Sequence, residues 1–508
     1  MNNSRTWNAK RNIFFGLINK FITLGLPFVI RTIIIYKLGV EYLGLSSLFS
    51  AILQVLNMAE LGFSSAIIFN LYKPMAEEDT EKICALMALY RKIYRIIGGG
   101  ILLVGIALTP FLTKLINGGY PRDINLYTLY LIYLINTSIS YLFFGYKNVL
   151  LTATQRQDIL NNIDTILILI RSVIQICLLC IASNYYLYII WNPIITLANN
   201  LIVSYITNRR FPKYVCRGDL DKTEISSIVR LVEGSAIGKV GQVARNSFDS
   251  IILSAFLGLT EVAIYSNYYY ILNAVAGIIS IAIQSIMAGV GNSIATESVE
   301  KNYCDFKRFN FYYSWIVAWC TICLMCLYQP FMKMWVGEKL SASIITVILF
   351  CIYFFIGQIG QVRAVYATSS GIWWEFRYLQ IGEMIGNLSL NFILGYFWGM
   401  NGIIIATIIT VLIFSVIGIG KKTIEIYFKK SAKEYFMLLA VYATITTLVG
   451  IITYGLCSLV RGNTIFILVV RFVLCCVIPN ILFAIIVYMN KEHRLYLSMF
   501  ISMIKTKK

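Results

Sequence analysis

Charged residues are scarce in this chain of 508 residues, and histidine is nearly absent. Lys, Arg, Asp and Glu together make up 13% of the sequence, about half of what soluble domains carry, whereas 58% of the residues are hydrophobic. The single histidine, His493, lies in the basic segment KEHR, which excludes a histidine-based metal site or catalytic dyad. This composition excludes an ordinary soluble domain and favours a membrane protein.

Signatures of nucleotide use and of secretion are also missing. The glycine cluster IIGGGILLVG has no lysine after it, so it is not a phosphate-binding loop. Residues 1–11 are polar and basic, and the first apolar run is too long for the core of a signal peptide. We therefore expect no signal peptide, no cofactor and no enzymatic activity.

The cysteines lie mostly inside apolar segments. Cys320, Cys323 and Cys326 are spaced as C-x2-C-x2-C, which imitates an iron–sulfur spacing. The run falls in the middle of a predicted helix and no fourth ligand follows it, while cysteine is common as a small apolar core residue. We therefore predict structural cysteines and no metal site.

Long apolar segments follow one another along the whole chain. Each contains about 20–30 residues, enough to span a membrane as a helix, and polar or Gly/Pro-containing junctions separate about fourteen of them. The predicted spans are 12–37, 42–72, 90–116, 125–150, 158–182, 186–208, 230–257, 261–295, 309–336, 342–369, 378–398, 401–420, 435–458 and 464–489. They predict an all-α polytopic protein of the cell (inner or plasma) membrane.

The basic residues fall mainly on one side of these spans. If the N-terminus is cytoplasmic, the segments 209–222, 297–308 and 421–433 and the tail after Lys491 are cytoplasmic too, and together with the other inner junctions they hold most of the 43 basic residues. The opposite junctions hold few of them: Lys37, Lys114, Arg122, Lys333, Lys339 and Arg461. The asymmetry places both termini in the cytoplasm and explains most of the net charge of +19 without a nucleic-acid partner.

The two halves of the chain resemble each other. Lys20 and Leu38-Gly39 recur, at one constant offset, as Lys239 and Leu257-Gly258, and TPFLTKL (109–115) recurs as QPFMKMW (329–335). The copies are separated by an even number of spans, which predicts a parallel repeat of two six-helix bundles, a common transporter architecture. The predicted parts are an N-terminal bundle (1–208), a basic cytoplasmic linker (209–229), a C-terminal bundle (230–428), and two additional helices with a basic tail (429–508).

The start of the chain resembles a known family of membrane proteins. The segments RNIFFGLINKFITLGLPFVIRTIIIYKLGVEYLGLSSLF (11–49) and AELGFSSAIIFNLYKPMAEEDTEKI (59–83) are similar to those of Wzx-like polysaccharide repeat-unit flippases of the multidrug/oligosaccharidyl-lipid/polysaccharide exporter superfamily. The resemblance implies movement of an undecaprenyl-pyrophosphate-linked oligosaccharide, a unit of O-antigen, capsule or exopolysaccharide, from the cytoplasmic to the outer leaflet. It also implies alternating access around a cationic central cavity.

Cations inside the predicted spans are the candidate substrate-binding residues: Lys20, Arg31, Lys239 and Arg245. Lys20 and Arg31 return to nearly the same face of their helix, about 16 Å apart along its axis. We expect the four side chains to line a water-filled cavity and bind pyrophosphate, arginine as a bidentate donor and lysine as a point charge. The alternative is that each is neutralised by a neighbouring acid or extends to an interface.

Three further charges are candidates for ion coupling or charge balance: Glu60, Asp249 and Arg171. Glu60 either binds a coupling proton or only balances Lys20. Asp249 lies one helical turn after Arg245, a spacing that allows a local ion pair.

Other polar groups in the spans have mainly structural interpretations. Arg171 and Asp164 are seven residues apart on one helix face and can balance each other, and we expect Arg363 and Arg471 to be structural or interfacial. Glu383, Asn387 and Asn391 form a polar stripe that predicts bundle packing first and sugar contact second, and Gly382–Gly386 is a GxxxG packing motif.

Alternative functions remain open at this point. An ion-coupled multidrug antiporter or a peptidoglycan lipid-precursor flippase of the same superfamily shares the expected architecture. A polymerase or ligase is disfavoured because the predicted outer loops are short. Expected partners are the polyprenyl-pyrophosphate-linked oligosaccharide, a coupling proton or sodium ion, and a polysaccharide polymerase with its assembly machinery.

Overall fold

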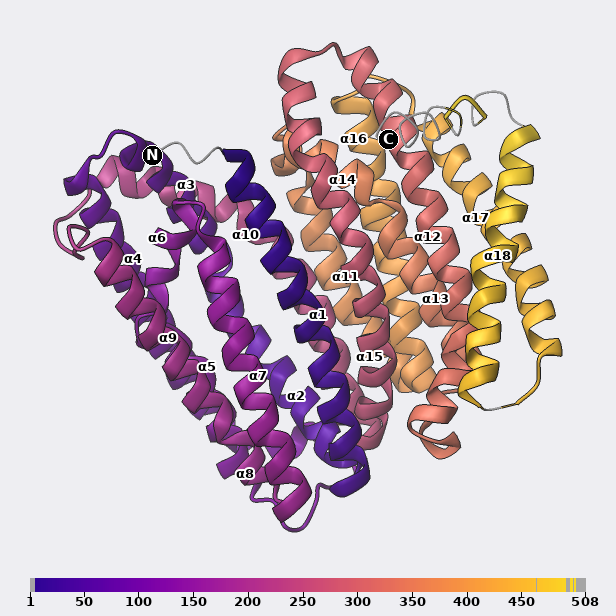
Figure 1. Cartoon of the computed structure of the whole chain (residues 1–508), viewed down its shortest axis with the longest axis horizontal. Helices are drawn as coiled ribbons and strands as arrows, with labels where there is room; N and C mark the ends of the chain where they lie inside the picture. The colour runs from indigo at the N-terminus through magenta and orange to yellow at the C-terminus, as the bar shows by residue number, and fades with distance from the viewer. Residues whose placement is uncertain (1–4, 463, 490–493, 497, 499–508) are drawn as a thin grey trace. The chain divides into compact units, whose positions relative to one another are not determined.

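The computed structural model describes residues 5–462, 464–489, 494–496 and 498, and every regular element among them is helical (Figure 1). His493 lies outside the described residues. A helix satisfies its backbone N–H and C=O groups internally, which a lipid environment requires. The predicted all-α class is confirmed.

Many of these helices are membrane spans by length and composition. Within the described residues, eleven helices are long and apolar enough to cross a membrane, or up to twelve if one bent pair is a single span. That pair, Leu126–Leu142 and Gly145–Ala153, is bent by 46°. The prediction of a multi-pass membrane protein is confirmed, while the count of about fourteen spans and the cytoplasmic placement of the termini stay predictions.

The chain divides into two units, Met1–Ala263 and Ile264–Lys508. The helices of unit 1 are α1 (Arg5–Lys37), α2 (Val40–Leu56), α3 (Phe63–Ala76), α4 (Thr80–Leu108), α5 (Leu126–Leu142), α6 (Asn148–Ala153), α7 (Gln157–Ala182), α8 (Tyr185–Ile189), α9 (Trp191–Arg210) and α10 (Lys222–Leu257), with the 3-10 segments η1 (Asn57–Glu60), η2 (Thr109–Leu115) and η3 (Gly145–Lys147). Helix α11 (Leu259–Thr296) begins in unit 1 and continues into unit 2.

Unit 2 contains the remaining helices of the described chain. They are α12 (Val299–Trp335), α13 (Ile344–Ile359), α14 (Gln361–Ser369), α15 (Arg377–Thr410), the π-helix η6 (Val411–Ile419), α16 (Gly420–Ile426), α17 (Ala432–Leu459) and α18 (Ile465–Met489), with the 3-10 segments η4 (Glu338–Leu340) and η5 (Ile372–Phe376). Helices α17 and α18 both pack on α12 and on each other.

Unit 1 is held together by a buried apolar core and by the packing of α1 along α7. Leu45, Leu48 and Phe49 of α2 are fully buried in this core. The Phe49 ring meets the rings of Tyr130 and Tyr133 of α5 edge-on, at centroid separations of 5.4 and 5.5 Å. Edge-to-face contacts of this kind add to the packing that fixes α2 against α5.

Helix α10 is tied to unit 1 along its length. Lys82 of α4 pairs with Glu224 at the start of α10 (2.5 Å), and the backbone N–H of Asn117 donates to the Ser254 carbonyl near its end (2.9 Å). The unit boundary therefore lies after α10, whereas the sequence repeat counts this segment with the second bundle. The predicted parts, with a linker at 209–229 and a boundary between 428 and 429, follow the sequence repeat rather than the two structural units. They stay a prediction.

Glycines end the first helix of each repeat copy. Gly39, after α1, has φ 122°, and Gly258, after α10, has φ 88°. Residues with a Cβ rarely adopt positive φ, so glycine is the natural residue for a turn between two closely spaced helices. The repeated Leu-Gly pair thus has the same structural role in both copies.

A third glycine break divides the longest apolar stretch. The stretch Trp374–Ile426 is interrupted at Gly399, with φ 57° and ψ −136°, so the chain turns back on itself. Beyond the turn, the ring of Phe414 fills the space beside Gly382 and Gly386, as expected for a GxxxG packing motif. The predicted boundary between spans 378–398 and 401–420 is confirmed.

The polar stripe on α15 is part of this packing. Asn387 and Asn391 are buried, and Asn387 Nδ2 donates to the Thr407 hydroxyl at 3.0 Å. Asn391 Nδ2 donates to Asn387 Oδ1 at 3.3 Å, while Glu383 of the same stripe acts electrostatically on Arg363. Within the membrane such interhelical hydrogen bonds hold helices together, which confirms packing as the first role of the two asparagines.

Arg363 and Arg471 are structural, as predicted. Arg363 is 3% exposed and donates to the carbonyl oxygens of Ser415 and Val416 (3.4 Å for Val416) in the π-helix η6. Arg471 donates through Nε and an Nη atom to the Val460 carbonyl at the end of α17, at 3.1 and 2.7 Å. Both guanidinium groups satisfy carbonyls that helix geometry leaves without an α-helical partner.

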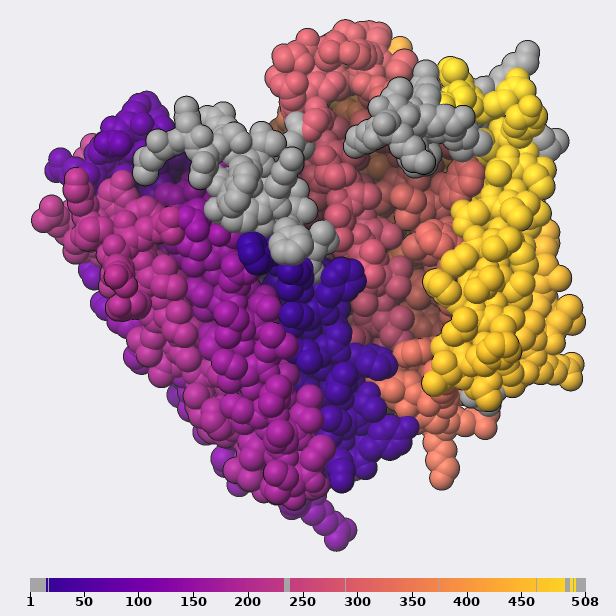
Figure 2. Space-filling view, in the orientation of Figure 1, coloured from indigo at the N-terminus to yellow at the C-terminus, as the bar shows by residue number. Residues whose placement is uncertain are grey.

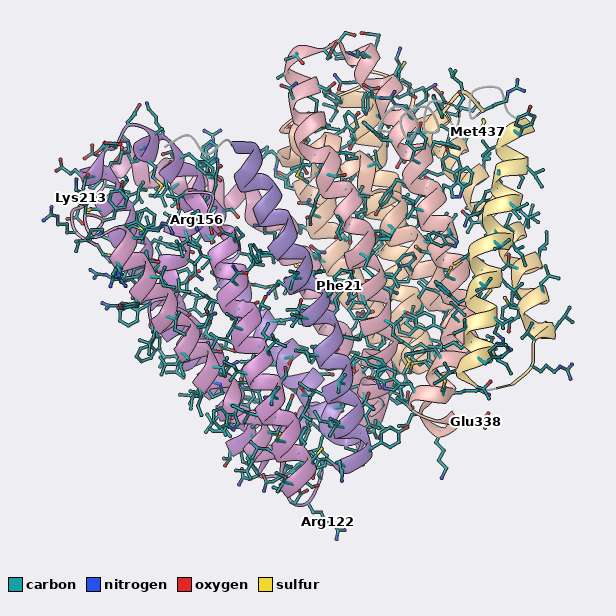
Figure 3. All side chains as sticks on the ribbon, viewed as in Figure 1. Phe21, Arg122, Arg156, Lys213, Glu338 and Met437 are labelled. Carbon is teal, nitrogen blue, oxygen red and sulfur yellow. The ribbon has the colours of Figure 1, made fainter. Side chains whose placement is uncertain are left out.

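All the side chains labelled in Figure 3 except Phe21 lie near the ends of a unit. In unit 1, Arg156 and Lys213 lie at one end and Arg122 at the other; in unit 2, Met437 and Glu338 lie at opposite ends. In unit 1, the predicted inner junctions with Arg156 and Lys213 are therefore separated from the predicted outer junction with Arg122 by the length of the helices.

The outer faces of the C-terminal helices are apolar. Figure 2 shows α18 in yellow as an outer face of unit 2. On α17 and α18, Leu459, Phe466 and Ile481 are all more than half exposed. Exposed apolar side chains on long helices are expected where a protein contacts lipid.

The turn at Gly399 gives a stability prediction. A Cβ on Gly402 would overlap the Leu394 carbonyl oxygen, so we expect Gly402→Ala to destabilise unit 2 by about 1–3 kcal/mol. Gly455→Ala on α17 is the matched control, because no heavy atom lies within 4 Å of its added Cβ. Thermal unfolding of the purified protein in detergent measures both, and equal melting temperatures for the two variants would contradict the prediction.

Candidate functional site

A polar pocket of about 310 Å³ lies within unit 1. Its wall includes Glu60 of η1, Tyr94 of α4, Asp164 and Arg171 of α7, and Asn200 of α9. Ligand sites commonly have volumes of this order and a few converging polar groups. Charged side chains inside a membrane protein cost free energy of insertion, and those that are present commonly have a function. This pocket is therefore the candidate functional site.

Glu60 reaches the pocket because the chain leaves α2 just before it. Helix α2 ends at Leu56, a 3-10 segment follows, and Gly62, with φ 105°, turns the chain into α3. The Glu60 carboxylate lies beside the Tyr94 hydroxyl and the backbone N–H of Ser64, both of which can donate hydrogen bonds to it. These donors offset part of the cost of burying the carboxylate.

Lys239 is the cation that acts on Glu60. Its Nζ donates to the Ser65 hydroxyl at 3.0 Å, and its charge acts electrostatically on the Glu60 carboxylate. The sequence had suggested Lys20 as the balancing cation. The structure replaces Lys20 with Lys239, the residue that matches it in the repeat, because α10 packs against α3.

Asp164 and Arg171 both line the pocket, in keeping with their spacing on one helix face. Asn19 of α1 donates to Asp164 Oδ2 at 3.0 Å and to the Thr165 hydroxyl at 3.1 Å, so α1 fixes one wall. Arg171 Nε is buried, and no group in the described part of the chain accepts a hydrogen bond from it. A donor of this kind is available to a ligand or water.

The sequence analysis did not single out the asparagines of α9 or the tyrosine of α4. Asn200 Nδ2 donates to the Ile139 carbonyl at 3.2 Å, and Asn199 also lines the pocket. The adjacent pair Asn199–Asn200 in the middle of a predicted span was the available signal. Tyr94 gave none, because tyrosine is common near membrane interfaces.

The four predicted cavity cations lie elsewhere. Lys20 is exposed on α1, and Arg31, also on α1, is half-buried and acts electrostatically on Tyr188 together with Arg171. Neither of these two, nor Lys239 or Arg245, belongs to the pocket wall. The shared cavity predicted for them stays a prediction.

On α10, the predicted pair of opposite charges is partly buried. Asp249 is 2% exposed and Arg245, one turn before it, is half-buried. Ser247, between them, donates to Gln54 of α2 at 3.3 Å. Burial of an acid and a base one turn apart fits mutual neutralisation at this position.

The charge in the pocket is mixed rather than positive. Two carboxylates, Glu60 and Asp164, face one guanidinium, Arg171, and Lys239 supplies a second positive charge from beyond the wall. Carboxylates in such a pocket can bind a proton or a small cation, and the basic groups can offset their charge when the pocket is empty.

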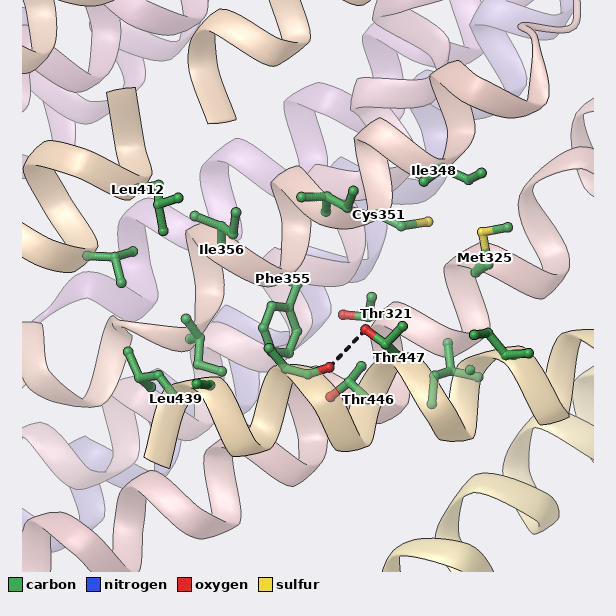
Figure 4. Close-up of a pocket in the computed structure, with 18 of the residues that line it drawn as sticks. Thr321, Met325, Ile348, Cys351, Phe355, Ile356, Leu412, Leu439, Thr446 and Thr447 are labelled. Atoms are coloured by element: carbon green, nitrogen blue, oxygen red, sulfur yellow. Dashed lines mark hydrogen bonds between the residues drawn. The ribbon is translucent and has the colours of Figure 1, made fainter. Parts of the chain in front are cut away.

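Unit 2 contains a larger cavity of the opposite character (Figure 4). It has a volume of about 840 Å³ and lies among α12, α13, η6 and α17. Its labelled wall residues include Met325, Phe355 and Leu412, and the Thr447 hydroxyl donates to the Ala443 carbonyl at 2.9 Å rather than into the cavity. No charged side chain of the described residues lines it, so it suits an apolar group.

The fold is shared with solved structures of membrane transporters. The chain matches a lipid II flippase MurJ in an inward closed conformation with a TM-score of 0.69 and 12% identity, over 93% of this chain and 98% of the other. It matches a multidrug resistance MATE family transporter of the MOP superfamily in an inward-facing conformation with a TM-score of 0.62 and 14% identity, over 85% and 99%. A MATE structure in a bent conformation gives a TM-score of 0.55 and 13% identity, over 87% and 97%.

At these identities the likeness establishes the fold. No protein-family model and no curated protein matches the sequence. The many apolar helices and the shared fold confirm the multi-pass integral membrane protein that the sequence predicts.

The pocket predicts an energetic coupling between Asp164 and Arg171. Arg171→Met leaves two carboxylates without a guanidinium in the pocket, so we expect a loss of stability of roughly 1–3 kcal/mol. Adding Asp164→Asn should recover part of the loss, giving a coupling of about 0.5–3 kcal/mol in a double-mutant cycle. The cycle is measured by unfolding of the purified protein in detergent. Arg122→Met, in an exposed loop, is the control, and strictly additive effects would contradict the coupling.

Proposed function

We propose that this protein is a Wzx-like flippase that moves polyprenyl-pyrophosphate-linked oligosaccharide repeat units, of an O-antigen, capsule or exopolysaccharide, from the cytoplasmic to the outer leaflet. The observation that carries the proposal is the fit to a lipid II flippase, which extends over 93% of the chain with a TM-score of 0.69. The resemblance of segments 11–49 and 59–83 to repeat-unit flippases supports the choice of an oligosaccharide substrate.

The substrate has an apolar tail and an anionic linkage, and each needs a matching environment. The apolar cavity of unit 2 is of a size and chemistry suited to part of a polyprenyl chain. In the proposal, Lys20, Arg31, Lys239 and Arg245 supply positive charge for the pyrophosphate, because phosphate oxygens accept charge-assisted hydrogen bonds from lysine and arginine. Alternating access of the two predicted bundles then exposes the headgroup to each side in turn.

The polar pocket of unit 1 has the coupling role in this proposal. In the proposal, Glu60 and Asp164 bind a proton or sodium ion, and Arg171 and Lys239 adjust the charge; the position of Glu60, Asp164 and Arg171 on one pocket wall supports this. An ion bound at a carboxylate lowers the free-energy cost of closing the pocket to water. It therefore shifts the equilibrium between the inward-open and outward-open conformations of the proposed cycle. Asp249, one helical turn from Arg245 on α10, has the role of charge balance in the proposal.

A multidrug antiporter is the second candidate function. It is favoured by the likeness to MATE transporters and by the two carboxylates in the unit 1 pocket, which suit cationic substrates. A peptidoglycan lipid-precursor flippase is a third candidate, favoured by the same structural likeness as the leading proposal. None of these candidates is an enzyme, and a polysaccharide polymerase with its assembly machinery is the partner expected only for the first.

Reconstitution into liposomes distinguishes the three candidates. We expect the protein to flip a fluorescently labelled polyprenyl-pyrophosphate oligosaccharide, measured by loss of signal to a membrane-impermeant quencher, faster than lipid II and without transport of ethidium. An imposed proton gradient should alter the rate in wild type but not in Glu60→Gln, since the amide cannot exchange a proton. Ethidium transport without flipping would favour the antiporter, and preference for lipid II the precursor flippase.

Charge reversal tests the proposed cations. Lys20→Glu and Lys239→Glu should each lower polysaccharide export about tenfold or more, the effect of losing about 1.4 kcal/mol of interaction with the pyrophosphate. Lys339→Glu, in a predicted outer junction, is the control. Unchanged export by both variants at normal membrane abundance would count against the cationic site.

A further inference from the structure

Thiols from three helices of unit 2 converge at one buried point. Cys326 of α12, Cys457 of α17 and Cys475 of α18 have sulfur atoms that all lie within 4.8 Å of one another. The Cys457 and Cys475 Sγ atoms are 3.8 Å apart, too far for a disulfide bond and close enough to share a ligand.

A fourth thiol is adjacent. Cys323 precedes Cys326 by one helical turn on α12, which puts both on one face of the helix, and its side chain contacts that of Cys475. The sequence analysis set aside the C-x2-C-x2-C run because no further ligand follows it. The fold supplies the further ligands from α17 and α18, which lie far away in the sequence.

We propose that Cys326, Cys457 and Cys475 form an intramembrane binding site for a thiophilic d10 metal ion, Zn²⁺ or Cu⁺, with the Cys323 thiol beside it. Soft thiolate ligands select these ions over Mg²⁺, Ca²⁺ and Mn²⁺. A tetrahedral Zn²⁺ with Zn–S bonds of about 2.3 Å holds its sulfurs about 3.8 Å apart. The Cys457–Cys475 separation of 3.8 Å has this value already.

The surroundings favour a charged metal–thiolate centre over isolated thiols. Each thiol that coordinates releases its proton, and a Zn²⁺ ion with three thiolates keeps one negative charge. Arg471, one turn before Cys475 on α18, acts electrostatically on Cys457 and Cys475 and offsets that charge. Near neutrality is what a site buried among apolar side chains requires.

The supporting groups also fix the ligand positions. The Trp319 indole Nε1–H donates to the backbone carbonyl of Cys475 at 2.9 Å. Arg471 donates to the Val460 carbonyl, three residues beyond Cys457 on the chain, and so joins the ends of α17 and α18. Such partners beyond the ligands orient them and raise metal affinity.

Access to the thiols is available from an apolar cavity of about 430 Å³. Cys320 and Cys323 line it together with side chains of α11, α12 and α18. The cluster itself is closed, since Cys326, Cys457 and Cys475 are 0–2% exposed. A closed thiolate set is typical of structural rather than catalytic metal sites, so the proposed ion joins α17 and α18 to α12.

Metal analysis of the full-length protein tests the proposal. We expect elemental mass spectrometry to find about one Zn²⁺ or Cu⁺ per chain in the wild-type protein purified in detergent. The variants Cys475→Ser and Cys457→Ser should contain no such metal. Cys351→Ser, at a buried cysteine of α13 outside the cluster, should retain the metal. Separate loading with Zn²⁺ alone and with Cu⁺ alone identifies which ion is bound.

A spectroscopic measurement on the wild-type protein tests the site even if the cysteine variants fail to fold. Co²⁺ added to wild type should produce sulfur-to-metal charge-transfer absorption, displaced by Zn²⁺, and removal of metal from wild type should lower its melting temperature. Absence of metal from the purified protein, together with no charge-transfer band after loading, would overturn the proposal. A Cys457–Cys475 disulfide found in non-reduced peptides would overturn it as well.

Discussion

The cost of placing charge and unpaired polar groups away from water governs this structure. In lipid, each backbone N–H and C=O group must find a partner within the protein, which is why the described chain is built from helices. Where helix geometry leaves carbonyls without partners, a side chain supplies the donor, as Arg363 does in η6 and Arg471 at the end of α17. Three half-buried charges, Glu60, Asp164 and Arg171, line one pocket of unit 1, and the buried Asp249 lies one helical turn from Arg245 on α10.

The cavities of the two units are lined by side chains of different polarity. The pocket in unit 1 collects carboxylates, a guanidinium and amides, while the larger cavity in unit 2 is walled by apolar side chains. The apolar cavity of unit 2 suits the polyprenyl part of the proposed substrate, and a compact cationic drug has no comparable apolar chain. The shared transporter fold is compatible with either substrate, so the chemistry of the cavities, more than the arrangement of helices, carries the distinction.

Local signals in the sequence predicted local features well. Glycine at positions 39, 258 and 399 indicated helix ends because positive φ favours glycine, and the GxxxG motif at Gly382–Gly386 indicated close packing. The spacing of Asp164 and Arg171 on one helix face correctly placed both at one site. What the sequence could not provide was which helices meet. One of the two roles open for Glu60 was to balance Lys20, whereas the cation that acts on it is Lys239 of α10. The thiols that join Cys326 come from helices more than a hundred residues away.

The π-helix η6 has a consequence for the register of the chain that follows it. A wide turn inserts a residue relative to an α-helix, and each inserted residue rotates all later side chains by about 100° around the axis. Lys422, just beyond η6, donates to the Glu375 carbonyl at 2.8 Å in this rotated register. Shortening the segment 411–419 by one residue would therefore leave α16 helical but rotate its lysines onto a different face. The number of residues in η6 thus determines which way the side chains of α16 point.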